Sequence, residues 1–223
     1  MTTRELMLRT KAAWGSLRDM DEAAKNQMLR TMADQLLAEQ EEILQANAAD
    51  MEAARNSISK VMLDRLLLDE NRLRGMADGI RALTALPDHT GRILSEVTRP
   101  NGLVIRKVQV PLGLVASSYE SRPNVTSDAA ALTLKSGNVC VLRSGKESIR
   151  SASAIVAALK SGIASVGGDP DILNLVQDTS RESARELMQA SGLVALLIPR
   201  GGAGLNRACE ENATDPCIQT GTG

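Results

Sequence analysis

The sequence is nearly devoid of aromatic residues, with one Trp, one Tyr and no Phe among 223 residues. Aromatic rings form the stacking surfaces of single-strand nucleic-acid sites and the aromatic belts of membrane proteins. The sequence therefore has too few aromatic residues for either function. Neither sign of charge dominates, because 26 Lys and Arg face 27 Asp and Glu for a formal net charge of −1. We therefore expect no nucleic-acid partner, no membrane partner, and a core of Leu, Ile, Val, Ala and Met.

Histidine and cysteine are also scarce. The single histidine, His89, leaves little for a metal site or for a Ser-His-Asp set. The three cysteines, Cys140, Cys209 and Cys217, match no disulfide framework or zinc spacing, which fits a reducing compartment. No apolar run approaches the roughly 20 residues that span a bilayer, and the polar start does not lead into a signal-peptide core. We predict a cytoplasmic location.

The first part of the chain has the pattern of helices. Apolar residues recur at helical steps along one helix between Leu29 and Ile43, and along a second from about Glu70 to Leu86, before Pro87. The stripes consist of Leu29, Met32, Leu36 and Ile43, and of Leu73, Met76, Ile80 and Leu83. We predict a helical segment over residues 1–100 that carries little chemistry.

Beyond residue 100 the pattern alternates between strand and helix. Strands are predicted at 103–110, 112–118, 139–142, 173–176 and 194–198, and helices at 125–134, 144–161, 181–190 and 205–210. Ser144 and Glu147 have the spacing of a capping box at the start of the second of these helices. The alternation favours an α/β fold with a parallel sheet. Residues 216–223 have the pattern of a strand and a loop that lead further, so we expect the sequence to be a fragment.

Ligands of parallel sheets bind where strands end, and three such segments carry suitable residues: 119–124, 143–147 and 199–204. The second combines two cations with a glycine, which suits a phosphate, and the third has three glycines. Simpler roles remain open for each. The glycines could be ordinary turn residues, since Arg207 occupies the last small position of a dinucleotide fingerprint. Arg143 and Lys146 could be surface cations, and spacing alone favours Asn124 as a helix cap.

The cysteines offer no evident nucleophile. Cys140 lies between two valines and is interpreted as a small buried residue, while Cys209 and Cys217 lack a paired histidine.

The same segments carry a family resemblance. They are YESRPNVT (119–126), KSGN (135–138), LRSGKE (142–147) and LIPRGGAGL (197–205), together with ANAAD (46–50) and MLDRL (62–66). They closely resemble the gamma-glutamyl phosphate reductases, a family of the aldehyde dehydrogenase superfamily. The likeness covers essentially the whole chain, but only about the first half of the family's usual length. It implies an aldehyde dehydrogenase-like fold with N-terminal helices, an incomplete NADP-binding Rossmann-like domain over residues 101–223, and a missing catalytic domain.

The resemblance also implies an activity, the reduction of L-glutamyl 5-phosphate by NADPH to the 5-semialdehyde and phosphate in proline biosynthesis. In such enzymes a cysteine thiolate expels phosphate and leaves a thioester that accepts hydride. That cysteine comes after the segment matching 219–223, so we expect this chain alone to be inactive. Besides the small-molecule substrate, a homo-oligomer and a complex with glutamate 5-kinase are conceivable partners.

Residue by residue, the resemblance assigns one catalytic role. Asn124 matches the asparagine whose side-chain amide contributes to the oxyanion hole. Gln219 stands where hydrolytic relatives have a glutamate that activates water, and an amide is a poor base. We therefore hypothesise that Gln219 leaves the thioester protected from water.

The resemblance assigns the remaining residues to the cofactor. Arg143 matches a lysine that binds the adenosine ribose, and Lys146 replaces a glutamate of NAD-preferring relatives, which favours NADPH. Gly201 and Gly202 match the glycine turn under the cofactor phosphates. The other members of the predicted cofactor site are Ser121, Arg122, Pro123, Ser144, Gly145, Arg200 and Gly204. Among them, the first three are expected to line the groove by their backbone.

A different class of function stays open. The chain could be a stand-alone, non-catalytic module that binds a nucleotide or forms oligomers. If it is instead truncated, apolar surface should lie uncovered, and we expect poor solubility or self-association.

Overall fold

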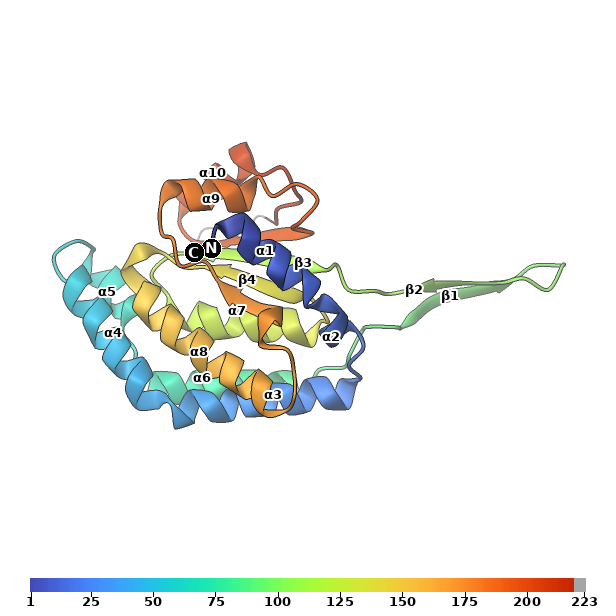
Figure 1. The fold of residues 1–223 in the computed structure, drawn as a ribbon, viewed down its shortest axis with the longest axis horizontal. Helices are drawn as coiled ribbons and strands as arrows, with labels where there is room; N and C mark the ends of the chain where they lie inside the picture. Colours follow the sequence, from blue (N-terminus) through green and yellow to red (C-terminus); the bar gives the residue numbers. More distant parts are fainter. Residues whose placement is uncertain (219–223) are drawn as a thin grey trace.

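The computed structural model describes residues 1–218, and it has a four-stranded sheet between two groups of helices with a two-stranded arm projecting from the body (Figure 1). The strands are β1 (Ile93–Thr98), β2 (Val104–Val108), β3 (Leu114–Tyr119), β4 (Val139–Arg143), β5 (Leu173–Leu175) and β6 (Leu196–Arg200). The helices are α1 (Thr3–Ala12), α2 (Trp14–Arg18), α3 (Glu22–Ala38), α4 (Gln40–Ala54), α5 (Lys60–Leu66), α6 (Glu70–Leu83), α7 (Pro123–Lys135), α8 (Ile149–Ser165), α9 (Arg181–Met188) and α10 (Ala203–Asn212).

The sheet is parallel throughout, in the order β5-β4-β3-β6. Every residue of β3 is buried, as are the first four of β4, because helices cover both faces of the sheet. The register pairs Ser118 with Arg143 and Tyr119 with Arg200, so β3, β4 and β6 end side by side. The predicted α/β fold with a parallel sheet is therefore confirmed.

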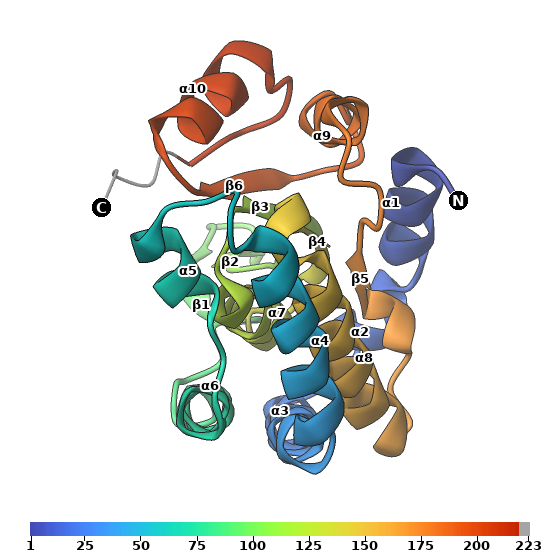
Figure 2. The same cartoon turned by 90° about the vertical axis from the view of Figure 1, so that its left-hand side faces the viewer.

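The helices form layers on the two faces of the sheet. Helices α7 and α8 cover one face, with α3, α4 and α6 packed outside them (Figure 2). Helices α1, α9 and α10 lie on the other face. Within residues 1–218 no helix is long and apolar enough to cross a bilayer.

The N-terminal helices differ from the prediction in one respect. The stripe predicted as a single helix is divided, because the helix breaks at Glu39 between α3 and α4. Its apolar residues are nevertheless all completely buried, as expected of a stripe that faces a core. The second predicted stripe is confirmed in α6, which ends at Leu83, before Pro87.

The arm differs from the prediction of a helical segment up to residue 100. Residues 93–98 form strand β1, which pairs antiparallel with β2 and lies beyond the last helix of the segment. Every residue of both strands is exposed, so the arm has no buried face. The strand predicted at 103–110 is nevertheless confirmed as β2, whereas β1 was not predicted. Residue 100 itself lies in the turn of this hairpin.

Close contacts join the N-terminal helices to the part of the chain that carries the sheet. The Thr31 hydroxyl on α3 donates to the Gly162 carbonyl on α8 at 2.9 Å. A carboxylate oxygen of buried Asp50 on α4 accepts bonds from the Ser151 N–H and hydroxyl, both at 2.7 Å. Helices before and after residue 100 thus share one hydrophobic core.

Helix α8 can approach α3 only because residue 162 is glycine. A Cβ at Gly162 would lie 2.6 Å from the Cα of Met32, a backbone atom that cannot turn away. We expect Gly162→Ala to lower the free energy of unfolding by about 1–3 kcal/mol, the usual cost of overpacking. Gly79→Ala on α6 is the matched control, since no atom lies within 4 Å of its Cβ position. Urea unfolding of both variants checks this; a Gly162→Ala variant at least as stable as the unmodified chain would refute it.

Candidate functional site

Three loops meet at the edge where β3, β4 and β6 end. A Cβ at Gly145, after β4, would lie 3.5 Å from the Cα of Glu120, after β3. A Cβ at Gly201, after β6, would lie 2.8 Å from the carboxyl carbon of the same Glu120. The structure therefore brings together all three segments that the sequence analysis singled out.

Glu120 is the centre of this meeting point, and the sequence analysis gave it no role. Its carboxylate accepts a hydrogen bond from the Gly202 N–H at 2.9 Å. Gly202 is the N-cap of α10 and has no side chain to cap the helix, so the carboxylate stabilises the positive end of the helix. An anion thus already occupies the glycine turn that was predicted to receive phosphate. The sequence did contain one signal for Glu120, because it directly follows a buried strand and lies within the segment 119–124.

Three buried serine hydroxyls at this edge have no hydrogen-bond partner among the described residues. They belong to Ser118 and Ser121 around the end of β3 and to Ser144 after β4, and each residue is at most 3% exposed. A buried hydroxyl without a partner costs free energy, and few occur in a native structure. Such groups, gathered where strands end, are what a polar ligand would satisfy.

The two cations at the end of β4 and just after it, Arg143 and Lys146, have different surroundings. The Arg143 guanidinium donates to the Thr179 and Ser180 carbonyls at 3.2 and 2.8 Å, and burial lowers its pKa. The reading of Arg143 as a solvated surface cation is therefore wrong. Lys146 is exposed, and its ammonium makes no hydrogen bond or ion pair with residues 1–218. It is free to meet a ligand or solvent.

The predicted capping box at Ser144 and Glu147 is wrong. The Ser144 hydroxyl has no partner, and a 3₁₀ turn, Lys146–Ser148, precedes α8. Helix α8 begins only at Ile149, with Ser148 as its N-cap and no side-chain capping bond. The Ser144 hydroxyl is instead buried at the edge of the sheet where β3, β4 and β6 end.

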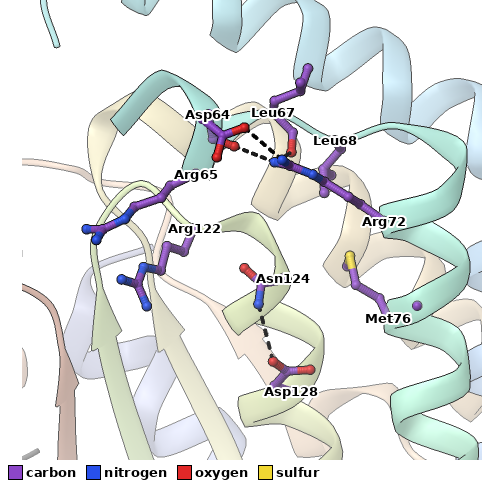
Figure 3. A pocket seen from close by; sticks show the side chains of 10 residues that line it. Asp64, Arg65, Leu67, Leu68, Arg72, Met76, Arg122, Asn124 and Asp128 are labelled. Carbon is purple, nitrogen blue, oxygen red and sulfur yellow. Dashed lines mark hydrogen bonds and ion pairs between the residues drawn. The ribbon is translucent and has the colours of Figure 1, made fainter. Parts of the chain in front are cut away.

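The alternative role of Asn124 as a helix cap is also wrong. Asn124 is the second residue of α7, after Pro123, and the N-cap is Arg122. Its side-chain nitrogen lies 3.5 Å from a carboxylate oxygen of Asp128, one turn further along the helix (Figure 3). Partial burial raises the pKa of Asp128, against the opposing effects of Asn124 and Arg200. The second hydrogen of the Asn124 amide remains available to a ligand.

Asn124 faces a cavity of about 500 Å³ between α5, α6 and the start of α7. Its lining residues are Asp64, Arg65, Leu67, Leu68, Arg72, Gly75, Met76, Arg122, Asn124 and Asp128 (Figure 3). Sequence reasoning missed this cavity, because the N-terminal helices were expected to carry little chemistry. The segment MLDRL, which contains Asp64 and Arg65, carried the resemblance and was the one signal that pointed there.

The remaining predicted site residues lie at the same edge. The carbonyl of Arg200 accepts a bond from the Glu120 N–H at 3.4 Å, and its side chain lines a second, more apolar cavity of about 320 Å³. Gly204 is in the first turn of α10 with open space at its Cβ position. Gln219 lies outside the described residues.

The cysteines of this part of the chain are not activated thiols. Burial raises the pKa of Cys140 in β4 to about 12, and raises the pKa of Cys209 to about 11. Burial also raises the pKa of Cys217, which pairs with Leu197 in a parallel bridge beside β6. Reactive cysteines require the opposite shift. Cys140 is the small buried residue that the sequence predicted.

Comparison with known proteins identifies the family to which the chain belongs. A family model described as "Aldehyde dehydrogenase family" matches residues 3–215. Gamma-glutamyl phosphate reductases from Streptococcus suis and Neisseria meningitidis are 58% and 56% identical over 100% of this chain, which covers 54% and 53% of their own lengths. A crystal structure of that enzyme from Thermotoga maritima superposes with a TM-score of 0.97 at 33% identity, over 100% of this chain and 54% of that one. The chain thus spans about half the length of these relatives, and it belongs to the aldehyde dehydrogenase family.

Proposed function

We propose that this chain is the cofactor-binding half of an enzyme that reduces L-glutamyl 5-phosphate with NADPH to L-glutamate 5-semialdehyde and phosphate. The observation that carries the proposal is 58% identity, over the whole chain, to a relative named gamma-glutamyl phosphate reductase. At this level of identity the segments that meet at the strand ends are expected to serve the same chemistry. The family implies a nicotinamide cofactor, which supplies hydride when bound.

The residues at the strand ends fit such a cofactor. The unpartnered hydroxyls of Ser121 and Ser144 and the N–H groups at Gly201 and Gly202 would hold its phosphates and sugars. The Glu120 carboxylate now accepts the Gly202 N–H, so we propose that it turns away when phosphate binds. The choice of NADPH rests on Lys146, whose unpaired ammonium suits a 2′-phosphate. The Arg143 guanidinium already donates hydrogen bonds to the Thr179 and Ser180 carbonyls, so the choice does not rest on it.

Asn124 is the catalytic residue that we propose within this chain. Its amide and the uncapped first turn of α7 offer N–H donors where an oxyanion would develop. The nucleophile is proposed to come from the part of the relatives that this chain does not span, since burial raises the pKa of all three thiols here.

The test uses a completed enzyme, in which residues 1–223 are followed by the matching remainder of the Streptococcus suis relative. We expect phosphate-dependent reduction of NADP⁺ by glutamate 5-semialdehyde, and no turnover by the 223-residue chain alone. Lys146→Glu should lower the ratio of kcat/KM for NADP⁺ to that for NAD⁺ by about tenfold or more, because a charge-assisted bond becomes a repulsion. Arg30→Glu, at an exposed position of the outer helix α3, is the control. An inactive completed enzyme that still binds NADPH would favour a non-catalytic nucleotide-binding module.

Partners and location belong to the same proposal. The arm exposes apolar side chains on both strands, including Ile93, Val97, Val104 and Ile105, which supports self-association of this chain into a homo-oligomer. A complex with glutamate 5-kinase remains a further proposal. A cytoplasmic location suits the free thiols of Cys140, Cys209 and Cys217.

A further inference from the structure

We propose that the cavity beside Asn124 receives the amino-acid end of the substrate, with Arg65 and Arg122 on its α-carboxylate and Asp128 on its α-ammonium group. The inference rests on the proposed function and extends it, because it names what recognises the glutamyl group. The cavity, of about 500 Å³, is within the range of small-molecule sites.

The two arginines are the first reason. Neither the Arg65 nor the Arg122 guanidinium makes a hydrogen bond or ion pair with another described residue, although both line the same cavity. Figure 3 shows both groups on the same side of Asn124. Arg72, in contrast, donates to Asp64 and to the Leu67 carbonyl at 2.8 and 2.9 Å and is already neutralised. Two like charges that face one cavity without a counter-ion favour an anion there.

Asp128 is the second reason, because it adds the opposite charge to the cavity. Its carboxylate lies one turn beyond Asn124 on α7, and its nearest described partner is the Asn124 amide at 3.5 Å, a long contact. Asp128 lines the cavity and forms no ion pair with a described residue, and partial burial raises its pKa despite the opposing effect of Arg200. A ligand with an ammonium group would supply that compensation. Paired cations and a separate carboxylate match the zwitterion of an α-amino acid.

The phosphoryl group of the substrate is the competing source of negative charge. In glutamyl 5-phosphate it is bonded to the reacting acyl group, whereas the α-carboxylate lies three carbons away. A phosphoryl group would gain from the arginines but would be repelled by Asp128. The presence of Asp128 therefore favours the amino-acid end, and the two sources predict different kinetics.

The experiment measures the KM for glutamate 5-semialdehyde and the KM for phosphate separately in the completed enzyme. Arg65→Gln and Arg122→Gln should each raise the KM for the semialdehyde by about 10- to 100-fold and leave the KM for phosphate unchanged, as expected for loss of a charge-assisted bond. Arg74→Gln, at an exposed position of α6 outside the cavity, should change neither. Asp128→Asn should raise the KM for the semialdehyde but not for glutarate semialdehyde, which lacks the amino group.

Other outcomes overturn the inference. A rise in the KM for phosphate alone would place the phosphoryl group on the arginines, and no change in either KM would remove them from the site. If the completed enzyme has no turnover, the proposed function fails, and binding decides the inference by itself. In that case, L-glutamate should shift the NMR signal of the Asn124 amide in the 223-residue chain, and Arg65→Gln should weaken this binding at least about tenfold. If the Arg65→Gln variant and the unmodified chain bind L-glutamate equally well, the inference is contradicted.

Discussion

Replacing Asn124 by Ala lowers kcat of the completed enzyme by about 10²–10³-fold, the usual cost of losing one oxyanion donor. Asn124 is the second residue of α7, and its side-chain amide contacts Asp128 at 3.5 Å. The amide lines the cavity and does not cap the helix. Since an oxyanion forms only as the reaction proceeds, kcat should fall while the KM for semialdehyde changes little.

Two measurements separate this role from a structural one. Asn71→Ala, at an exposed position of α6, should leave kcat within a factor of about two, as expected for a surface change. The dissociation constant for NADPH should be the same in Asn124→Ala as in the unmodified protein. A loss of kcat below about tenfold would show that Asn124 is not a donor to the oxyanion.

Replacing Asp88 by Ala lowers the free energy of unfolding by about 3–5 kcal/mol, because the change leaves a buried charge without a partner. The Lys25 side chain is 1% exposed, and its ammonium donates to a carboxylate oxygen of Asp88 at 2.7 Å. The Lys25 ammonium also donates to the Thr90 hydroxyl at 3.4 Å, but an uncharged hydroxyl cannot neutralise it. The double variant Asp88→Ala with Lys25→Met should recover much of the loss, since it removes the orphaned charge as well.

The effect should depend on pH in a defined direction. Partial burial acts to raise the pKa of Asp88, but the bonds from Lys25 and Thr90 outweigh burial and hold this pKa below its usual value. The carboxylate therefore contributes stability above about pH 4, and that contribution is lost as the pH falls below it. Urea unfolding at pH 7 and at pH 3 checks both points. A difference between Asp88→Ala and the unmodified chain that grows towards acid would contradict the assignment.

Most parts of the fold that the sequence predicted are those where burial imposes a pattern, and the exposed strand β2 was predicted from its apolar and β-branched residues alone. The strands β3 to β6 and helix α6 have apolar residues at the positions that a covered sheet or helix requires. The break at Glu39 was missed because its neighbours favour helix as strongly as the rest of the stripe. Strand β1 was missed because no residue of it is buried and, unlike β2, its sequence alternates apolar residues with Ser, Glu and Thr.

The candidate site was predictable only where a local rule applied. The rule that ligands bind where parallel strands end placed Arg143, Gly201 and their neighbours at one edge. This rule did not identify Glu120 or Asp128 as site residues, because their roles depend on which loop or helix lies opposite them in space. Arg65 was not identified either, because α5 meets the start of α7 only in the folded chain.

A crystal structure of the completed enzyme with NADP⁺ tests the account most directly. We expect the pyrophosphate over the glycine turn at Gly201, the Glu120 carboxylate displaced from the Gly202 N–H, the 2′-phosphate against Lys146, and Asn124 open to the cavity. A dinucleotide held anywhere other than across the ends of β3, β4 and β6 would contradict the assignment of these strands to cofactor binding.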